Sequence, residues 1–115
     1  MGKGEEMKKV YIAGALNSDA VGYIKNMNTM LVHADVVRRA GFAVYVPCLD
    51  FVMGLLSGDY QYHDYFNNSQ PFLLSCDAVY VCPHSENSKG TQSEIETAIK
   101  NNIPVVWNVD ELRVI

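Results

Sequence analysis

Four short, almost continuously apolar runs constrain the fold of this sequence more than any other feature. They span residues 10–13, 42–46, 77–82 and 103–107. A strand with one face in water alternates apolar and polar residues, whereas a continuously apolar strand is typical of a parallel sheet covered on both faces. The sequence therefore predicts a mainly parallel sheet that lies between layers of helices.

The segments between these runs carry the spacing of helices. Residues 24–40 contain apolar side chains at steps of three and four, which is the spacing of one helical face. That predicted face consists of Ile24, Met27, Leu31, Ala34 and Val37. Gly41 follows where a left-handed helix cap is expected, and a second helix is predicted over residues 92–101.

The middle and the tail of the chain give weaker patterns. Over residues 48–75 we expect a loop, then a helical piece, then a shorter helix that begins near Asn68 or Ser69. Pro71 is expected in the first turn of that shorter helix, because proline disrupts a helix interior. Residues 112–115 are expected to add a short edge strand.

These elements together predict one α/β domain over residues 1–115, a length that suits a single hydrophobic core. The expected architecture is a Rossmann-like or flavodoxin-like three-layer domain with a four- to five-stranded, mainly parallel sheet. Residues 1–8 are expected to form a flexible leader before the first strand.

Charge and composition exclude several classes of partner. The net charge is -4 and lysine and arginine do not cluster, which argues against nucleic-acid polymers and anionic membranes as partners. No apolar run approaches the length of a membrane span, and the first residues lack the apolar core of a signal peptide. We therefore expect a cytoplasmic protein.

The cysteines and histidines show no metal-binding spacing, so we expect no metal and no cofactor. Cys76 and Cys82 flank the third apolar run, which would separate their Cα atoms by roughly 20 Å in an extended strand. A disulfide requires about 4.4–6.8 Å between Cα atoms. The expected state of the cysteines is therefore three reduced thiols.

The candidate site follows the third apolar run, because open parallel sheets bind ligands beyond the carboxyl ends of their strands. Residues 83–91 lead from that run into the helix predicted over residues 92–101. Gly90 permits a close approach of backbone to a ligand, and Ser88 and Thr91 add hydroxyl groups. The first N–H groups of a helix have no partner within it, so this segment can hold an anion or a sugar hydroxyl.

Glu94 is the acid that this helix offers to a cleft. The inward face of the helix is predicted to consist of Ile95, Ala98 and Ile99. A turn of about 100° per residue places Glu94 at the border of that face and Glu96 nearer to solvent. The helix dipole is expected to lower the pKa of Glu94. An alternative reading is a capping box, in which Thr91 and Glu94 satisfy each other's backbone N–H groups.

A set of motifs extends over residues 10–107 in a fixed order. They are Tyr11-Ile12-Ala13-Gly14, Cys76-Asp77-Ala78-Val79-Tyr80-Val81, Ser88-x-Gly90-Thr91-x-x-Glu94, Ala98 and Ile103-Pro104-Val105. Together they resemble the nucleoside 2-deoxyribosyltransferase-like superfamily, which includes deoxynucleoside monophosphate N-glycosidases. The resemblance implies an enzyme that cleaves or transfers the N-glycosidic bond of a (deoxy)nucleoside or nucleotide.

The resemblance also implies roles for individual residues. Glu94 matches the catalytic glutamate that attacks C1′ of the sugar and forms a covalent glycosyl-enzyme intermediate. Tyr11 matches a tyrosine that helps to place this nucleophile or the sugar. Gly14 matches a position where the backbone meets the ligand, and Ser88 and Gly90 match the loop that meets the 5′ end.

Two positions depart from the family pattern. The family usually has an aspartate that assists the departing base where this chain has Ser69, and Asp64 is the nearest upstream acid that could substitute for it. The related monophosphate hydrolases have an arginine for the phosphate where this chain has Asn17, and Lys25 or Lys89 could compensate. The second departure favours a nucleoside over a monophosphate as substrate, whereas the first leaves the identity of the acid open.

Other functions stay open beside this one. The substitution at Ser69 fits a nucleoside- or nucleotide-binding or regulatory domain that has lost turnover. A structural or partner-binding domain would instead use the aromatic cluster over residues 60–66 as an interface. The Gly-Thr-x-x-Glu segment is also similar to cytokinin-type phosphoribohydrolases, whose Pro-Gly-Gly is missing here. The deoxyribosyltransferase-like resemblance further implies a homo-oligomer, because relatives commonly complete the site from a neighbouring subunit.

Overall fold

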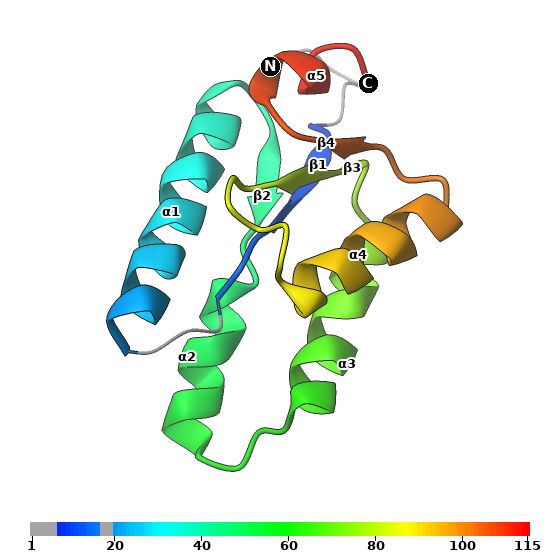
Figure 1. Cartoon of the computed structure of the whole chain (residues 1–115). Coiled ribbons are helices and arrows are strands. Elements are labelled where there is room, and N and C mark those ends of the chain that lie inside the picture. The colour runs from blue at the N-terminus through cyan, green and yellow to red at the C-terminus, as the bar shows by residue number, and fades with distance from the viewer. Residues whose placement is uncertain (1–6, 17–19) are drawn as a thin grey trace.

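A four-stranded sheet between helices forms the centre of the computed structural model, which describes residues 7–16 and 20–115 (Figure 1). The strands are β1 (Lys9–Ala13), β2 (Ala43–Tyr45), β3 (Ala78–Val81) and β4 (Val105–Val106). The helices are α1 (Ala20–Arg39), α2 (Cys48–Ser57), α3 (Tyr62–Leu74), α4 (Lys89–Lys100) and α5 (Val109–Leu112). Most of the predicted leader and Asn17 lie outside the described residues.

The sheet is parallel throughout, with the strand order β2-β1-β3-β4. All four apolar runs of the sequence supply a strand, which confirms the predicted three-layer α/β class. Tyr11 of β1 pairs with Tyr45 on one side and with Val79 on the other. The chain thus leaves β1 for one side of the sheet and returns to the other side at β3. Ligands bind in open α/β sheets at such a switch point.

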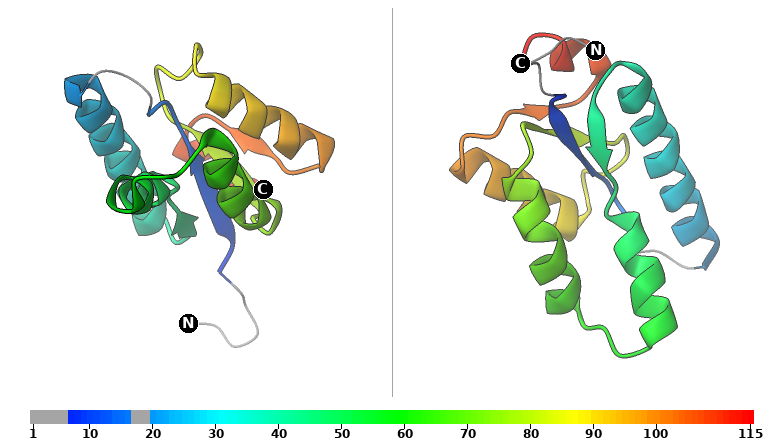
Figure 2. Two further views of the ribbon diagram at one scale, coloured as in Figure 1. Left: turned by 90° about the horizontal axis from the view of Figure 1, so that it is seen from below. Right: turned by 180° about the vertical axis from the view of Figure 1, so that it is seen from behind.

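Successive side chains of β1 enter two different cores, as a strand buried on both faces requires. Val10 and Ile12 pack on the face that carries α1, whereas Tyr11 and Ala13 pack on the face that carries α3 and α4. The four side chains are completely buried. Figures 1 and 2 show α1 and α4 on opposite sides of the sheet. β1 is therefore rigidly held just before its carboxyl end reaches the candidate site.

The inward face of α1 differs from the predicted one. Ala34 and Val37 are buried as expected, and Met30 joins them. Ile24 and Leu31 are exposed. They belong to a second group of apolar side chains on α1, which does not face the sheet. Gly41 adopts the predicted left-handed conformation after the helix, with φ at 105°.

The segment 48–75 folds differently from the predicted loop and helical pieces. α2 begins directly after Pro47, and α3 continues through Pro71, which lies in its interior rather than in its first turn. The hydroxyl of Tyr65 lies so close to Gly54 that a Cβ on Gly54 would overlap it. The close packing of α2 on α3 thus requires a glycine inside α2, where the sequence suggested a loop.

The C-terminal tail also departs from its prediction. Instead of an edge strand it forms the short helix α5, in which the side chain of Asn108 accepts a hydrogen bond from the Glu111 backbone N–H. Leu112 is consequently buried among the residues of the α1-side core. The tail covers the sheet rather than extending it.

The predicted thiol state of the cysteines is confirmed. Cys48, Cys76 and Cys82 are free and buried. Within the described ranges, no helix combines the length and the apolar character needed to cross a membrane.

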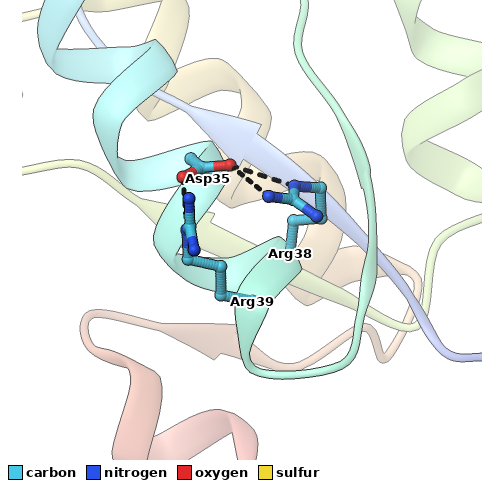
Figure 3. A network of polar contacts seen from close by, with 3 residues as sticks. All are labelled: Asp35, Arg38 and Arg39. Carbon is cyan, nitrogen blue, oxygen red and sulfur yellow. Dashed lines mark hydrogen bonds and ion pairs between the residues drawn. The ribbon is translucent and has the colours of Figure 1, made fainter.

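A small polar network closes the last turn of α1 at the end of the molecule opposite the candidate site (Figure 3). Asp35 accepts hydrogen bonds from Arg38 at 3.0 Å and from Arg39 at 2.7 Å. Both hydrogen bonds lower the pKa of Asp35, and the bond from Arg39 has the larger effect. Because the three side chains are on the surface, the pairs contribute little to stability, and the single charge of Asp35 offsets one of the two arginine charges.

Candidate active site

A cleft of about 860 Å³ opens beyond the carboxyl ends of β1 and β3, at the switch point of the sheet. Its lining comes from the segment after β1, from α3, and from the segment that joins β3 to α4. The lining residues are Gly14, Ala15, Leu16, Asn26, Pro47, Tyr65, Phe66, Ser69, His84, Asn87, Ser88, Lys89, Gly90, Thr91 and Glu94. The structure therefore brings together Gly14, Ser69, Ser88, Gly90, Thr91 and Glu94 of the predicted site.

Glu94 and Tyr11 form the central contact of the cleft. The Tyr11 hydroxyl donates a hydrogen bond of 2.5 Å to Glu94 Oε2, although the two residues are 83 positions apart in the chain. Such a short O–H···O distance is typical of a hydrogen bond to a carboxylate. The parallel pairing of β1 with β3 brings the end of β1 beside the start of α4, so this contact results from the sheet topology.

Burial raises the pKa of Glu94 to about 7, and the hydrogen bond from Tyr11 only partly opposes this rise. The sequence led us to expect a lowered pKa, and that expectation is wrong. α4 begins at Lys89 rather than at Gln92, so Glu94 lies in the second turn, and the influence of the dipole falls off within the first turn. Glu94 can therefore be charged or neutral near neutral pH.

Tyr11 is held by ring stacking and by its hydrogen bond to Glu94. Its ring stacks on Tyr45, whose ring stacks in turn on Phe72 of α3. Burial first, and then the charge of Glu94, raises the pKa of Tyr11. Tyr11 consequently stays protonated and acts as a hydrogen-bond donor to Glu94.

The start of α4 is capped by Ser88 and not by Thr91. Ser88 Oγ accepts hydrogen bonds from the backbone N–H of Thr91 at 3.2 Å and from its hydroxyl at 3.0 Å. Thr91 lies within α4 and its side chain is buried, whereas the Glu94 side chain points to Tyr11. The capping-box interpretation of Thr91 and Glu94 is therefore wrong, which frees the Glu94 carboxylate for the cleft.

The predicted orientation of α4 is confirmed except at one position. Ala98 is fully buried and Glu96 is exposed, as expected. Ile99, which was expected to face inward, is exposed. The inward stripe instead runs from Thr91 through Ile95 to Ala98.

The two glycines of the cleft, Gly14 and Gly90, differ in how closely the surrounding atoms approach them. A Cβ on Gly14 would lie 3.2 Å from Cys82 Cβ and 3.3 Å from the end of the Met30 side chain, so packing restricts that position. A Cβ on Gly90 would meet no heavy atom nearer than Ser88 Oγ at 4.0 Å. Glycine in a helix costs roughly 0.5–1 kcal/mol relative to alanine, and among the described residues no contact explains it at position 90.

Several residues of the site were not found by sequence reasoning. Ser85 is buried and accepts a hydrogen bond of 3.2 Å from the backbone N–H of Ala15, which joins the segments after β1 and β3. Tyr65 and Phe66 form an aromatic part of the lining. His84 lines the rim in the left-handed conformation, with φ at 63°. A positive φ at a non-glycine residue next to a cleft is the kind of local cost that functional sites retain.

Two candidates do not join this cleft. Asp64 caps its own helix, because its carboxylate accepts a hydrogen bond of 2.7 Å from the backbone N–H of Gln61. Lys25 is exposed on α1, where its neighbour Asn26 contributes to the lining instead. Asn17 lies outside the described residues. Lys89, by contrast, lines the cleft.

The fold and the cleft define a Rossmann-like α/β domain that holds a carboxylate and a tyrosine hydroxyl at the switch point of a parallel sheet. The chain belongs to the family described as Domain of unknown function (DUF4406), whose model matches residues 8–107. The matched region contains every residue that lines the cleft. The curated proteins include no match to the chain.

Proposed function

We propose that this domain is an enzyme that cleaves or transfers the N-glycosidic bond of a (deoxy)nucleoside or nucleotide, with Glu94 as the nucleophile. The proposal is carried by the Glu94 carboxylate, which lines the cleft and accepts the hydrogen bond of Tyr11 instead of capping α4. The resemblance to the nucleoside 2-deoxyribosyltransferase-like superfamily gives this pair its chemical meaning. Membership of that superfamily is part of the proposal.

The reaction divides into two displacements at C1′ of the sugar. In the first, a Glu94 oxygen bonds to C1′ while the C1′–N bond breaks, and the electron pair leaves with the base, which takes a proton from water. In the second, water or another base attacks C1′, loses a proton and releases the Glu94 carboxylate. Hydrolysis and transfer differ only in the group that performs the second attack.

The lining of the cleft suits both halves of a nucleoside. Tyr65 and Phe66 offer aromatic surface against which a base can stack. Gly90 leaves open space at the first turn of α4, where the backbone can approach the sugar. Lys89 and His84 lie at the rim, where they can contact a 5′-phosphate. Nucleosides and monophosphates are therefore both candidate substrates.

The test is a chromatographic assay of purified protein with a panel of nucleosides and 5′-monophosphates. We expect the wild type to release or exchange the base, and Glu94→Gln to lower the rate by about 10³-fold or more, as loss of a nucleophile does. Glu96→Gln is the matched control, because Glu96 is exposed on the same helix. Equal rates for Glu94→Gln and the wild type would refute the proposal.

The same panel separates turnover from binding. A rise in melting temperature with nucleosides, without release of base by the wild type, would identify a binding or regulatory domain. The substitution of the family aspartate by Ser69 is the feature that favours this second function. Absence of both binding and turnover would favour a structural role.

We also propose that the chain acts as a homo-oligomer in the cytoplasm. Support for assembly comes from the resemblance and from apolar side chains on the surface of α2, which are Val52, Met53, Leu55 and Leu56.

A further inference from the structure

We propose that Ser85 is a positioning residue, whose hydroxyl holds residues 14–16 against the loop after β3 and thereby sets the affinity of the cleft for its substrate. Ser85 is not among the described residues that line the cleft, so it acts through residues 14–16, which do line it. The effect on substrate affinity rests on the proposed function, whereas the effect on residues 14–16 can be measured in the ligand-free protein.

The hydrogen bond between Ala15 and Ser85 replaces the next backbone bond of the sheet. At the carboxyl ends of β1 and β3, the Cys82 N–H donates to the Ala13 carbonyl at 2.8 Å. A regular parallel ladder would continue with a bond from the Ala15 N–H to the Cys82 carbonyl. The Ala15 N–H instead donates to Ser85 Oγ at 3.2 Å. A side chain therefore replaces a backbone acceptor at the point where the strands end and the cleft opens.

The chain after β3 turns in a way that lets Ser85 reach this N–H group. Pro83 and His84 form a turn, and His84 has a φ of 63°, in the left-handed region. Proline followed by a residue with positive φ is typical of a type II turn, in which glycine or asparagine is usual at the second of these positions. Pro83 and His84 are exposed, whereas Ser85 directly after them is buried. The costly conformation of His84 thus accompanies the inward orientation of the Ser85 hydroxyl.

Residues on either side of Ala15 are held by other contacts. A Cβ on Gly14 would lie 3.2 Å from Cys82 Cβ, so the backbone passes close to Cys82 there. Leu16 is buried, and its carbonyl accepts a long hydrogen bond of 3.5 Å from the Asn26 side chain. The amide of Ala15 between them depends on the Ser85 hydroxyl as its acceptor. Loss of this acceptor would leave a partly buried N–H group unpaired and would loosen the segment.

The Ser85 hydroxyl can be removed without displacing the reacting groups. The backbone carbonyl of Ser85, and not its hydroxyl, accepts a hydrogen bond of 3.1 Å from the N–H of Ser88, which caps α4. Glu94 and Tyr11 contact each other directly and belong to α4 and β1. A change confined to Ser85 Oγ should consequently loosen residues 14–16 and leave the nucleophile in place.

A segment that is fixed before binding favours affinity, because the ligand does not have to order it. Residues 14–16 form one wall of the cleft, whereas the bond-breaking step is assigned to Glu94. Loosening of this wall should therefore weaken the binding of the ground state and of the transition state by similar amounts. Such uniform weakening raises KM and leaves kcat nearly unchanged.

The first test is amide hydrogen exchange of the ligand-free protein, followed by NMR. We expect the Ala15 amide to be protected in the wild type. Ser85→Ala should speed its exchange by about tenfold or more, as loss of one hydrogen bond does, and should leave the Cys82 amide nearly unchanged. Ser85→Thr keeps the hydroxyl and should restore the protection.

Ser75→Ala is the matched control, because Ser75 Oγ also bonds a backbone group but is exposed at the end of α3. It should leave the exchange of Ala15 unchanged. A wild-type Ala15 amide that exchanges as fast as an unstructured one would overturn the inference. Equal protection of Ala15 in the wild type and in folded Ser85→Ala would overturn it as well.

The chromatographic assay gives the functional readout. Ser85→Ala should raise KM for base release by about fivefold or more and keep kcat within about twofold of the wild type. A merely structural role of Ser85 would lower the fraction of active protein, and hence kcat, without changing KM. An unchanged KM would therefore exclude the positioning role.

The two measurements distinguish failure of this inference from failure of the proposed function. If the exchange of Ala15 responds as expected but the wild type releases no base, the proposed function fails and the positioning of residues 14–16 by Ser85 is supported. If the wild type releases base and Ser85→Ala matches it in both exchange and KM, only the positioning role fails.

Discussion

The burial of Glu94 gives the site an electrostatic cost that should be measurable in the stability of the protein. The carboxyl group has a pKa of about 7 in the folded protein against an ordinary value of 4.5. The folded state therefore binds the proton more tightly than the unfolded state between these two values. Its contribution to stability is fully present below pH 4.5 and is lost as the pH rises through 7.

We predict that Glu94→Gln is more stable than the wild type at pH 8, by about 3 kcal/mol. The neutral amide keeps the hydrogen bond of Tyr11 and never has to be charged in a buried place. Urea unfolding at pH 4.5 and pH 8 measures the difference, which should nearly vanish at the lower pH.

Glu96→Gln is the control for this prediction, because Glu96 is exposed two positions further along α4. It should leave the pH dependence of unfolding unchanged. A wild type that is as stable at pH 8 as Glu94→Gln would show that Glu94 is solvated in the folded protein.

At the scale of elements, the first turn of α4 contains a glycine that disfavours the helix, whereas the residues that follow pack firmly on the sheet. Gly90 lies in its first turn beside open space, whereas Thr91 and Ala98 are buried against the sheet. A glycine lowers helix stability, and no described residue packs closely against this position, so its presence fits a ligand that approaches the backbone.

We predict that Gly90→Ala raises the free energy of unfolding by up to about 1 kcal/mol and lowers the rate of base release by at least about tenfold. The added methyl group favours the helix but occupies the space in which the proposed sugar would bind. Urea unfolding and the chromatographic assay, applied to the same preparation, measure the two effects.

Gly14→Ala provides the contrast, since its methyl group would press on Cys82 and Met30 at 3.2–3.3 Å. That variant should lose stability by about 1–3 kcal/mol, as overpacked positions do. A Gly90→Ala protein with wild-type activity would remove the main reason for placing a ligand at the start of α4.

The strands were predictable from the sequence because their apolar runs report burial on both faces, independently of the partner strand. α2 and α3 were not, because their packing depends on a contact between Gly54 and Tyr65 that no local pattern shows. In the same way, the motif identified Glu94 as a site residue. The direction of its pKa shift depends on burial, which the position of Glu94 near a helix start does not predict. The hydrogen bond from Tyr11 to Glu94 joins residues 83 positions apart and exists only in the folded chain.

At the scale of the whole molecule, α2 and α3 project side by side beyond the carboxyl end of the sheet (Figures 1 and 2). The molecule is accordingly elongated, with extents of 43 × 25 × 24 Å. α3 carries Ser69 into the cleft, while α2 presents Leu55 and Leu56 to solvent at 72% and 85% exposure. Exposed apolar side chains gathered on one projecting helix are typical of a surface that another protein covers.

We predict that the covering protein is a second copy of the chain, and that Leu55→Lys combined with Leu56→Lys converts the oligomer into a monomer. Two charges at the contact would have to lose their hydration on assembly, which costs more than the contact contributes. Sedimentation velocity measures the change, and Val114→Lys is the control, because Val114 is equally exposed but lies after α5. If a neighbour completes the cleft, the monomeric variant should lose base release while its far-UV circular dichroism spectrum stays that of the wild type. A wild type that sediments as a monomer at all concentrations would refute the assembly.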